Sequence, residues 1–196
     1  MSSFGVVGAG VQAAWQAIYT AAETGADIVL VFARSDRSFL RFRDTVARFR
    51  PDLVVERCAD VTDLVRRTDL IVAATTSSTP VLPDSDLLRG KTLVSVGSFR
   101  PHMQELPDAA YRLAGAIVVD SPAAIHEVGD VINPVAAGLV PADRVTGLAD
   151  LVSGTHAATG STRIFKSVGH AIFDLFAARH FHRLAVERGL GQELNQ

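Results

Sequence analysis

The residues best suited to chemistry near the start of the chain form a glycine-rich turn, Gly8-Ala9-Gly10, followed by Val11, Gln12 and Ala13. The spacing Gly-x-Gly-x-x-Ala is typical of a turn that holds a dinucleotide. The first glycine permits the tight bend, the second lets the backbone approach a pyrophosphate, and the small third residue lets helix and strand pack closely. We therefore expect Gly8, Ala9, Gly10, Val11 and Gln12 at a pyrophosphate, with a ligand-free turn as the alternative.

Charged and hydroxyl side chains follow the next apolar run, in the order Arg34-Ser35-Asp36-Arg37. A site for NAD places an acid here to accept hydrogen bonds from the ribose 2′-hydroxyl, whereas a guanidinium suits the 2′-phosphate of NADP. Arg34, Ser35 and Arg37 therefore predict NADP. Asp36 keeps NAD open as the less favoured cofactor.

Small polar residues also follow two later apolar runs. Thr75, Thr76 and Ser77 come after one of them, and Val96, Gly97 and Ser98 end the next. We expect both groups to line the middle of the cofactor, although a polar loop after a buried strand would have the same composition.

Catalytic residues are not assigned by the sequence. His102 and His126 could donate protons, but a lone histidine is more often a bystander. Asp120, Glu105 and Asp130 could contact a ligand or cap a turn. No group of His, Cys, Asp and Glu has the spacing of a zinc site, so we expect no metal.

The elements that must position these residues alternate along the chain. Apolar runs predict strands at residues 4–7, 27–33, 53–56, 70–74, 92–96 and 117–119. Helical spacing predicts helices at 11–23, from Ser38 to the residue before Pro51, at 60–67, and at 167–188. This alternation predicts an α/β fold: one Rossmann-type domain over residues 1–196, with a doubly wound parallel sheet and a long C-terminal helix.

The last predicted helix has two apolar stripes on nearly opposite sides. Val168, Ile172, Leu175 and Phe176 form one; the other contains Phe173, Ala177, Phe181 and Leu184. A helix that is apolar on two sides needs two surfaces to pack against. We expect the sheet to be one, and a missing domain or a second chain to be the other.

Composition restricts the partners. The chain has 196 residues, 48% of them hydrophobic, and a net charge of −2, which does not point to nucleic acid or an anionic membrane. Its single cysteine, Cys58, fits a reducing compartment. We read no signal peptide, and the longest apolar runs are far shorter than a membrane span. A cytoplasmic protein is expected.

Seven segments, taken together and in order, carry a family resemblance: GVVGAGVQA, FARS, DLIVAATTSSTPVL, LVSVGSFRPHMQEL, AIVVDS, EVGD and IFKSVGHAIFDLFAA. In this order the chain resembles the ornithine cyclodeaminase/mu-crystallin family over nearly its whole length. The resemblance implies a Rossmann domain, a bound nicotinamide cofactor, and chemistry at a C=N bond beside a carboxylate. It also places Lys166 and Ser167 near the nicotinamide.

Two departures from the family pattern shape the expected function. Where the cyclodeaminase branch has an aspartate for proton transfer, this chain has Phe99, so it is more similar to the imine-reducing members. Only Met1-Ser2-Ser3 precede the first strand, where the family has a region that forms the dimer and grips the substrate carboxylate. We therefore expect a cofactor half that works as a homodimer or with a separate chain that supplies substrate-binding residues.

The expected activity is NADP(H)-dependent reduction of a C=N bond in a small cyclic or linear imino acid. Two alternatives stay open. One is a non-catalytic NAD(P)-binding module that acts with a partner chain, and the other is an NAD-dependent ornithine cyclodeaminase, which Phe99 disfavours.

Overall fold

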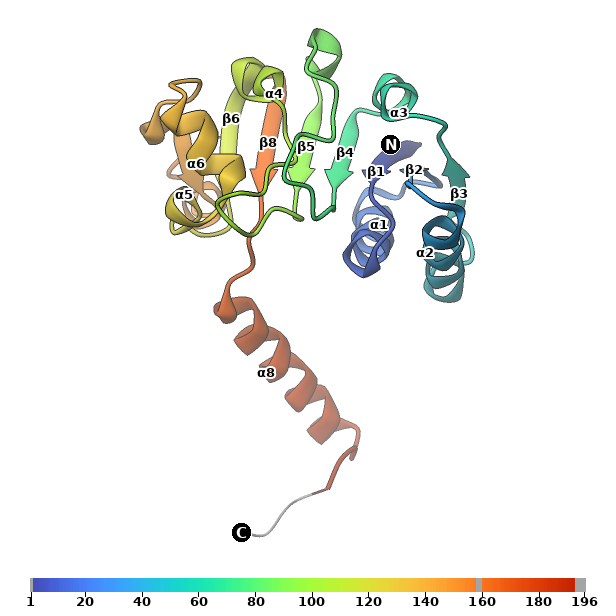
Figure 1. Ribbon diagram of the computed structural model, residues 1–196. Coiled ribbons are helices and arrows are strands. Elements are labelled where there is room, and N and C mark those ends of the chain that lie inside the picture. Colours follow the sequence, from blue (N-terminus) through green and yellow to red (C-terminus); the bar gives the residue numbers. More distant parts are fainter. Residues whose placement is uncertain (1, 158–159, 193–196) are drawn as a thin grey trace.

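A single parallel sheet forms the centre of the computed structural model, which describes residues 2–157 and 160–192 (Figure 1). The order of its strands is β3-β2-β1-β4-β5-β8-β6-β7, and every neighbouring pair is parallel. The strands are β1 (Ser3–Val7), β2 (Ile28–Phe32), β3 (Val54–Arg57), β4 (Leu70–Ala73), β5 (Thr92–Ser95), β6 (Ala114–Val119), β7 (Val145–Gly147) and β8 (Thr162–Lys166). The strand order reverses direction between β1 and β4, where doubly wound sheets bind ligands beyond the strands' carboxyl ends.

Helices cover both faces of this sheet because alternate residues of each strand point to opposite sides. On one face, Phe4 and Val6 pack with α1 (Val11–Thr24) and α2 (Asp36–Phe49). On the other face, Val7 packs in a core with α3 (Val61–Arg67) and α4 (Asp108–Leu113). Figure 1 shows α1 and α2 on the side of the sheet opposite α3. The remaining helices are α5 (Ala124–Glu127), α6 (Gly129–Ala136), α7 (Leu148–Val152) and α8 (Ala171–Glu187), with short 3₁₀ turns at Asp86–Leu88 and Ala142–Arg144.

The predicted Rossmann-type α/β fold with a C-terminal helix is confirmed, and the six predicted strands correspond to β1 to β6. Strand β6 begins at Ala114, three residues before the predicted 117, and the starts of two helices were wrong. The helix α2 begins at Asp36, two residues before the predicted Ser38, and is capped by Ser35, whose Oγ accepts from the Ser38 backbone N–H at 3.2 Å. The last helix begins at Ala171 rather than 167, because Lys166 belongs to a strand.

Strands β7 and β8 were not predicted. Strand β8 has the sequence TRIFK, in which only two residues are apolar, and it runs directly into a polar turn and an apolar helix. The spacing of apolar residues in the sequence does not distinguish this strand from the helix that follows it. Its position is set instead by pairing with β5 and β6, strands that lie far earlier in the chain.

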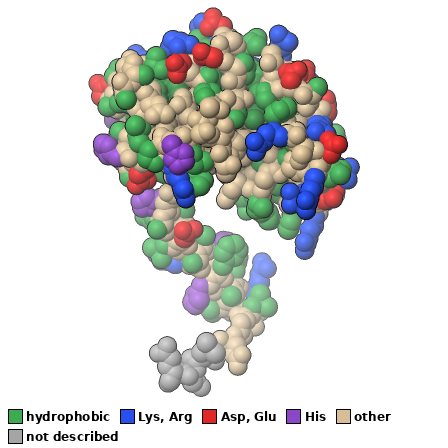
Figure 2. All heavy atoms as spheres, in the orientation of Figure 1, with side chains coloured by type: hydrophobic (Ala, Val, Ile, Leu, Met, Phe, Trp, Pro, Cys, Tyr) green, Lys and Arg blue, Asp and Glu red, His purple; other side chains and the backbone are tan. Residues whose placement is uncertain are grey.

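Helix α8 stands away from the rest of the molecule, as Figures 1 and 2 show. None of its residues is buried, and large apolar side chains remain exposed, among them Leu175, Phe176 at 60% and Phe181 at 68%. The expectation that this helix packs on the sheet was therefore wrong. Val168, assigned to one of its stripes, lies in the preceding turn and packs with Val119 and Val131.

No helix in the described residues combines the length and the apolar character that crossing a bilayer requires.

Candidate functional site

The glycine-rich turn lies at the carboxyl end of β1, between the ends of β2 and β4. Gly8 has a φ of 114°, and a Cβ at this position would lie 2.5 Å from the Ala74 carbonyl oxygen, so the tight bend requires glycine. Gly10 precedes α1 and has no other atom within 4 Å of where a Cβ would be. No side chain of the described residues caps α1 at Gly10, so the first N–H groups of the helix are available to an anion.

The end of β2 gathers two arginines at the same opening. Arg34 follows β2, and Arg41 lies one turn and a half into α2, with Ser35 and Ser38 between them. Asp36, which kept NAD open, is paired with Arg57 of β3 through its Oδ1. The carboxylate is therefore already engaged by a cation from the neighbouring strand.

These two regions border one cleft with a volume of about 470 Å³. Half of the predicted cofactor residues line it. They are Gly8, Ala9, Gly10, Arg34, Ser35, Thr75, Thr76 and Ser77. The sequence interpretation assigned neither Ser38 nor Arg41 to the cofactor, although their spacing of three residues places them on one face of the predicted helix. Helix spacing was the signal that could have found them.

The other predicted residues lie outside this lining. Val11 lines an adjoining groove between α1 and α2, and Gln12 is exposed on the first turn of α1. Arg37 is exposed on α2 but does not line the cleft. Val96 packs with the core beneath α1 and α2.

Gly97 and Ser98 are held against the end of β4. A Cβ on Gly97 would overlap the backbone of Thr75, so only glycine permits this approach. The carboxylate of Glu105, which is fully buried, accepts hydrogen bonds from the backbone N–H groups of Thr75 at 2.6 Å, Gly97 at 2.7 Å and Ser98 at 3.3 Å. One side chain therefore fixes both loops.

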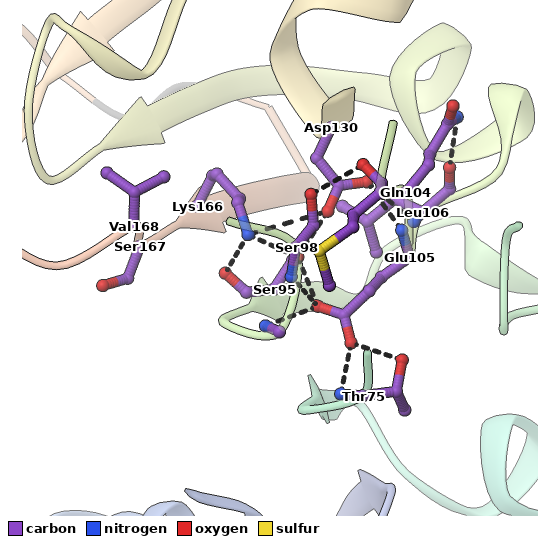
Figure 3. Close-up of polar contacts among 12 residues, drawn as sticks. Thr75, Ser95, Ser98, Gln104, Glu105, Leu106, Asp130, Lys166, Ser167 and Val168 are labelled. Atoms are coloured by element: carbon purple, nitrogen blue, oxygen red, sulfur yellow. Dashed lines mark hydrogen bonds and ion pairs between the residues drawn. The ribbon is translucent and has the colours of Figure 1, made fainter. Parts of the chain in front are cut away.

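Lys166 ends β8 with its side chain turned into the protein. It is 1% exposed, and its Nζ lies 3.1 Å from Ser95 Oγ and 3.7 Å from Asp130 Oδ2 (Figure 3). Burial lowers the pKa of the Lys166 ammonium, and the Asp130 and Glu105 carboxylates oppose that shift. The Lys166 side chain is therefore turned away from any ligand at this strand end.

Ser167 lies in the turn between β8 and α8. Its Oγ donates to Asp120 Oδ2 at 2.7 Å, and the same oxygen accepts from the backbone N–H groups of Val168 and Gly169. Asp120 therefore holds this turn, as the capping alternative had it. The N-cap of α8 is His170, so Ser167 lies before the helix and not at its start as predicted.

Acid–base groups are scarce at the cleft. Of the residues that line it, none is Asp, Glu, His or Lys. His102 and His126 are both exposed, and neither lines the cleft. Within residues 2–157 and 160–192, no group of three or more His, Cys, Asp and Glu could hold a metal ion. The described lining of the cleft therefore offers glycine backbone, hydroxyl groups and two guanidinium groups.

Comparison with known proteins gives a consistent result. Residues 1–189 match the model of a family described as the ornithine cyclodeaminase/mu-crystallin family. A Δ1-pyrroline-2-carboxylate reductase from Bacillus cereus is 40% identical over 141 residues, which cover 69% of this chain and 43% of that protein.

Two solved structures extend the comparison. One is a Δ1-pyrroline-2-carboxylate reductase of Thermococcus litoralis in complex with NADH and L-proline, with a TM-score of 0.88 and 26% identity, covering 98% of this chain and 61% of that one. The other is the iminosuccinate reductase of Paracoccus denitrificans in complex with NAD+, with a TM-score of 0.87 and 25% identity, covering 100% and 60%. This chain thus spans roughly half of these relatives' lengths.

Proposed function

The chain belongs to the ornithine cyclodeaminase/mu-crystallin family, and we propose that it is the NADP(H)-binding part of an oxidoreductase that reduces a C=N bond in a small imino acid. The observation that carries this proposal is the cleft at the carboxyl ends of β1, β2 and β4, where an open glycine turn leads into an uncapped helix. We also propose that residues 1–196 act as one dinucleotide-binding domain, because a single sheet runs through them.

The residues fit a dinucleotide in an extended pose. Gly8, Ala9, Gly10, Val11 and Gln12 would hold the pyrophosphate through backbone N–H groups and the positive end of α1. The bend at Gly8 and the open space at Gly10 support this assignment. Thr75, Thr76, Ser77, Val96, Gly97 and Ser98 would border the middle of the cofactor, and Lys166 and Ser167 the nicotinamide end.

The preference for NADP rests on the end of β2. Arg34 and Arg41, with the hydroxyls of Ser35 and Ser38, border the same opening and would bind a 2′-phosphate by charge-assisted hydrogen bonds. Arg37, which is exposed on α2 outside the cleft lining, would add a further positive charge near the 2′-phosphate. Because the Asp36 carboxylate is paired with Arg57, we do not expect it to accept a hydrogen bond from the ribose 2′-hydroxyl of NAD. The two solved relatives contain NADH and NAD+, so the cofactor has to be tested directly.

The chemistry divides between cofactor and protein. A bound nicotinamide cofactor would supply or accept a hydride, and this chain would bind and orient it. Phe99, which follows the β5 loop and is half exposed, cannot transfer a proton, so the cyclodeaminase alternative is disfavoured. Reduction of a pyrroline-2-carboxylate-like substrate fits this arrangement best.

A second candidate follows from the cleft's lack of acid–base side chains among the described lining residues. A non-catalytic NAD(P)-binding module would need none. An enzyme would need them from a second copy or from a separate chain. We propose a homodimer, because α8 exposes apolar side chains on two sides and the same helix of another copy could cover them.

Cofactor titration with turnover separates these proposals. We expect NADPH fluorescence to saturate with the purified chain, and pyrroline-2-carboxylate to be reduced. Binding without turnover would favour the module, and absence of binding by both NADPH and NADH would refute the whole assignment.

A charge-removing variant tests the cofactor preference. Arg34→Ala should weaken NADPH binding by about tenfold or more while NADH binding stays nearly unchanged, since only NADPH has the 2′-phosphate. Arg66→Ala is the matched control, because it removes the same charge from an exposed position of α3, which lies on the opposite face of the sheet. Equal losses for NADPH and NADH in Arg34→Ala would contradict NADP selection.

A further inference from the structure

Two carboxylates and one ammonium lie together beneath the proposed cofactor cleft, where none of them reaches solvent. Glu105 is fully buried, Asp130 is 2% exposed and Lys166 is 1% exposed. Figure 3 shows that the three side chains converge on Ser95, the last residue of β5. We call Ser95, Glu105, Asp130 and Lys166 the buried cluster. Its two carboxylates and one ammonium would carry a net negative charge if all were ionised.

The Ser95 hydroxyl has a single proton, but its oxygen lies within hydrogen-bond distance of two different carboxylate oxygens. Its Oγ lies 2.8 Å from Glu105 Oε2, 2.7 Å from Asp130 Oδ2 and 3.1 Å from Lys166 Nζ. A hydroxyl has one proton and can donate to only one carboxylate. The other short oxygen–oxygen contact would be repulsive without a proton, so one carboxyl group must itself donate to Ser95.

The hydrogen bonds of Glu105 show that it is not the donor. Oε1 accepts from the backbone N–H of Thr75 and from Thr75 Oγ1, and Oε2 accepts from the backbone N–H groups of Gly97 and Ser98. Both oxygens therefore face donors that bring their own protons, which leaves no acceptor for a proton carried by Glu105 itself, as an ionised carboxylate requires.

Asp130 has an oxygen that can carry the proton. Its Oδ1 accepts from the backbone N–H groups of Glu105 at 2.9 Å and Leu106 at 3.0 Å. Its Oδ2 has Ser95 Oγ as its hydrogen-bond partner, and the nearest cation, Lys166, is at 3.7 Å. A proton on Oδ2 would point at Ser95, whose own proton would then point at Glu105.

We propose that Asp130 is protonated at Oδ2 and donates through Ser95 to an ionised Glu105, and that Glu105 is the positioning residue that sets the spacing between the loops after β4 and β5. Lys166 is then the single counter-charge of Glu105, and the buried cluster is neutral. Neutrality independently calls for one protonated carboxyl group in the cluster, and the hydrogen bonds around Glu105 assign that proton to Asp130. Burial raises the pKa of Tyr111 well above its usual value, so its hydroxyl keeps the proton that it donates to the Asp130 backbone carbonyl.

The consequence for the cleft is geometric. Thr75 lines the cleft, and Gly97 packs directly on the Thr75 backbone. The Glu105 carboxylate accepts hydrogen bonds from the backbone N–H groups of both residues. A change in the charge or length of Glu105 would therefore move the loops after β4 and β5 relative to each other. The inference concerns this chain's own protons and holds whether or not a dinucleotide is the ligand.

Two amide variants test the assignment by their difference. Asp130→Asn imitates a protonated aspartic acid, because Nδ2 can donate to Ser95 while Oδ1 keeps its acceptor role. We expect its melting temperature to stay within about 3 °C of the parent. Glu105→Gln places an amide N–H₂ against a backbone N–H in either orientation, and we expect a fall of about 8 °C or more. Asp84→Asn is the surface control, in an exposed carboxylate that accepts from the Ala109 backbone N–H and pairs with Arg112.

Infrared spectroscopy of the parent protein decides the matter if Glu105→Gln does not fold. A protonated buried carboxyl gives a C=O stretch that should shift on ¹³C-labelling of aspartate but not of glutamate, vanish in Asp130→Asn and persist in Asp84→Asn. A band that follows the glutamate label would overturn the assignment. So would the absence of any such band, or a loss in Asp130→Asn as large as that in Glu105→Gln.

Discussion

The buried cluster and helix α8 invert the usual distribution of side chains. The cluster hides Glu105, Asp130 and Lys166 from solvent, whereas α8 exposes Phe176 and Phe181. Every charge in the first region has a partner within the chain, so burial is tolerated. The apolar surface of the second region has no such cover within the described residues. The contrast teaches that the polar groups of the cluster find their partners within this chain, whereas the apolar side chains of α8 do not among the described residues, and these are the side chains that the proposed homodimer would cover.

Removal of the cluster's only cation should give the largest effect. Lys166→Met leaves the Glu105 carboxylate buried without a counter-charge, so we expect a loss of about 3–5 kcal/mol in the free energy of unfolding, measured by urea denaturation. Arg89→Met is the surface control. The Arg89 guanidinium is paired with Asp86 and both side chains are exposed, so its loss should cost no more than about 1 kcal/mol. Equal effects in the two variants would mean that charge pairing in the cluster is unimportant.

A methyl group at Gly97 tests how tightly the cluster binds the two loops together. Gly97→Ala would force a Cβ into the Thr75 backbone, and we expect a loss of about 2–3 kcal/mol. Gly10→Ala adds the same methyl group where there is open space and a φ of −83°, so its unfolding free energy should change by less than about 1 kcal/mol. Chemical denaturation measures both, and a stable Gly97→Ala variant would show that the loops can separate.

A pH series examines a second kind of buried titratable group, the thiol of Cys58. Burial, followed by the nearby Asp63 carboxylate, raises the pKa of the Cys58 thiol from 9.0 to about 11. Below pH 9 both folded and unfolded states hold the proton. As the pH rises, the unfolded state loses it first, so stability falls up to about pH 11.

We expect the parent to lose up to about 2 kcal/mol more than Cys58→Ala across this range. Denaturation curves at several pH values provide the measurement. Parallel pH profiles for the two proteins would show that the thiol ionises freely in the fold.

The two regions also differ in how far the sequence predicts them. The turn at Gly8 and Gly10, and the alternating strands and helices around it, follow from local spacing and were predicted. The buried cluster was not, because Glu105, Asp130 and Lys166 stand in separate segments, and each alone fits a ligand contact or a cap equally well. The pairing of β5 with β8 sets Lys166 beside Ser95, and the loop after β5 and helix α6 bring Glu105 and Asp130 to the same hydroxyl.

The start of α8 shows the same limit. Helical periodicity extends back to residue 167, but Asp120, which is 47 residues away in sequence from Ser167, holds the turn at 167–169 out of the helix. A tertiary contact of this kind overrides a local period, and no local pattern reports it.

Substitutions in α8 should leave the fold untouched, which is the smallest expected effect on stability and the sharpest contrast with the cluster. Phe176→Glu with Phe181→Glu removes apolar side chains that contact no core, so at low protein concentration the melting temperature should equal that of the parent. If α8 pairs with a second copy, the parent's melting temperature should rise with concentration and its mass by light scattering should be twice that of the variant.

Leu64→Glu is the contrasting control, because Leu64 is fully buried under the sheet and its replacement should unfold the chain. A parent that stays monomeric at all concentrations would refute the homodimer. A variant that melts well below the parent even when dilute would show instead that α8 packs on its own sheet, and the difference between the two regions would disappear.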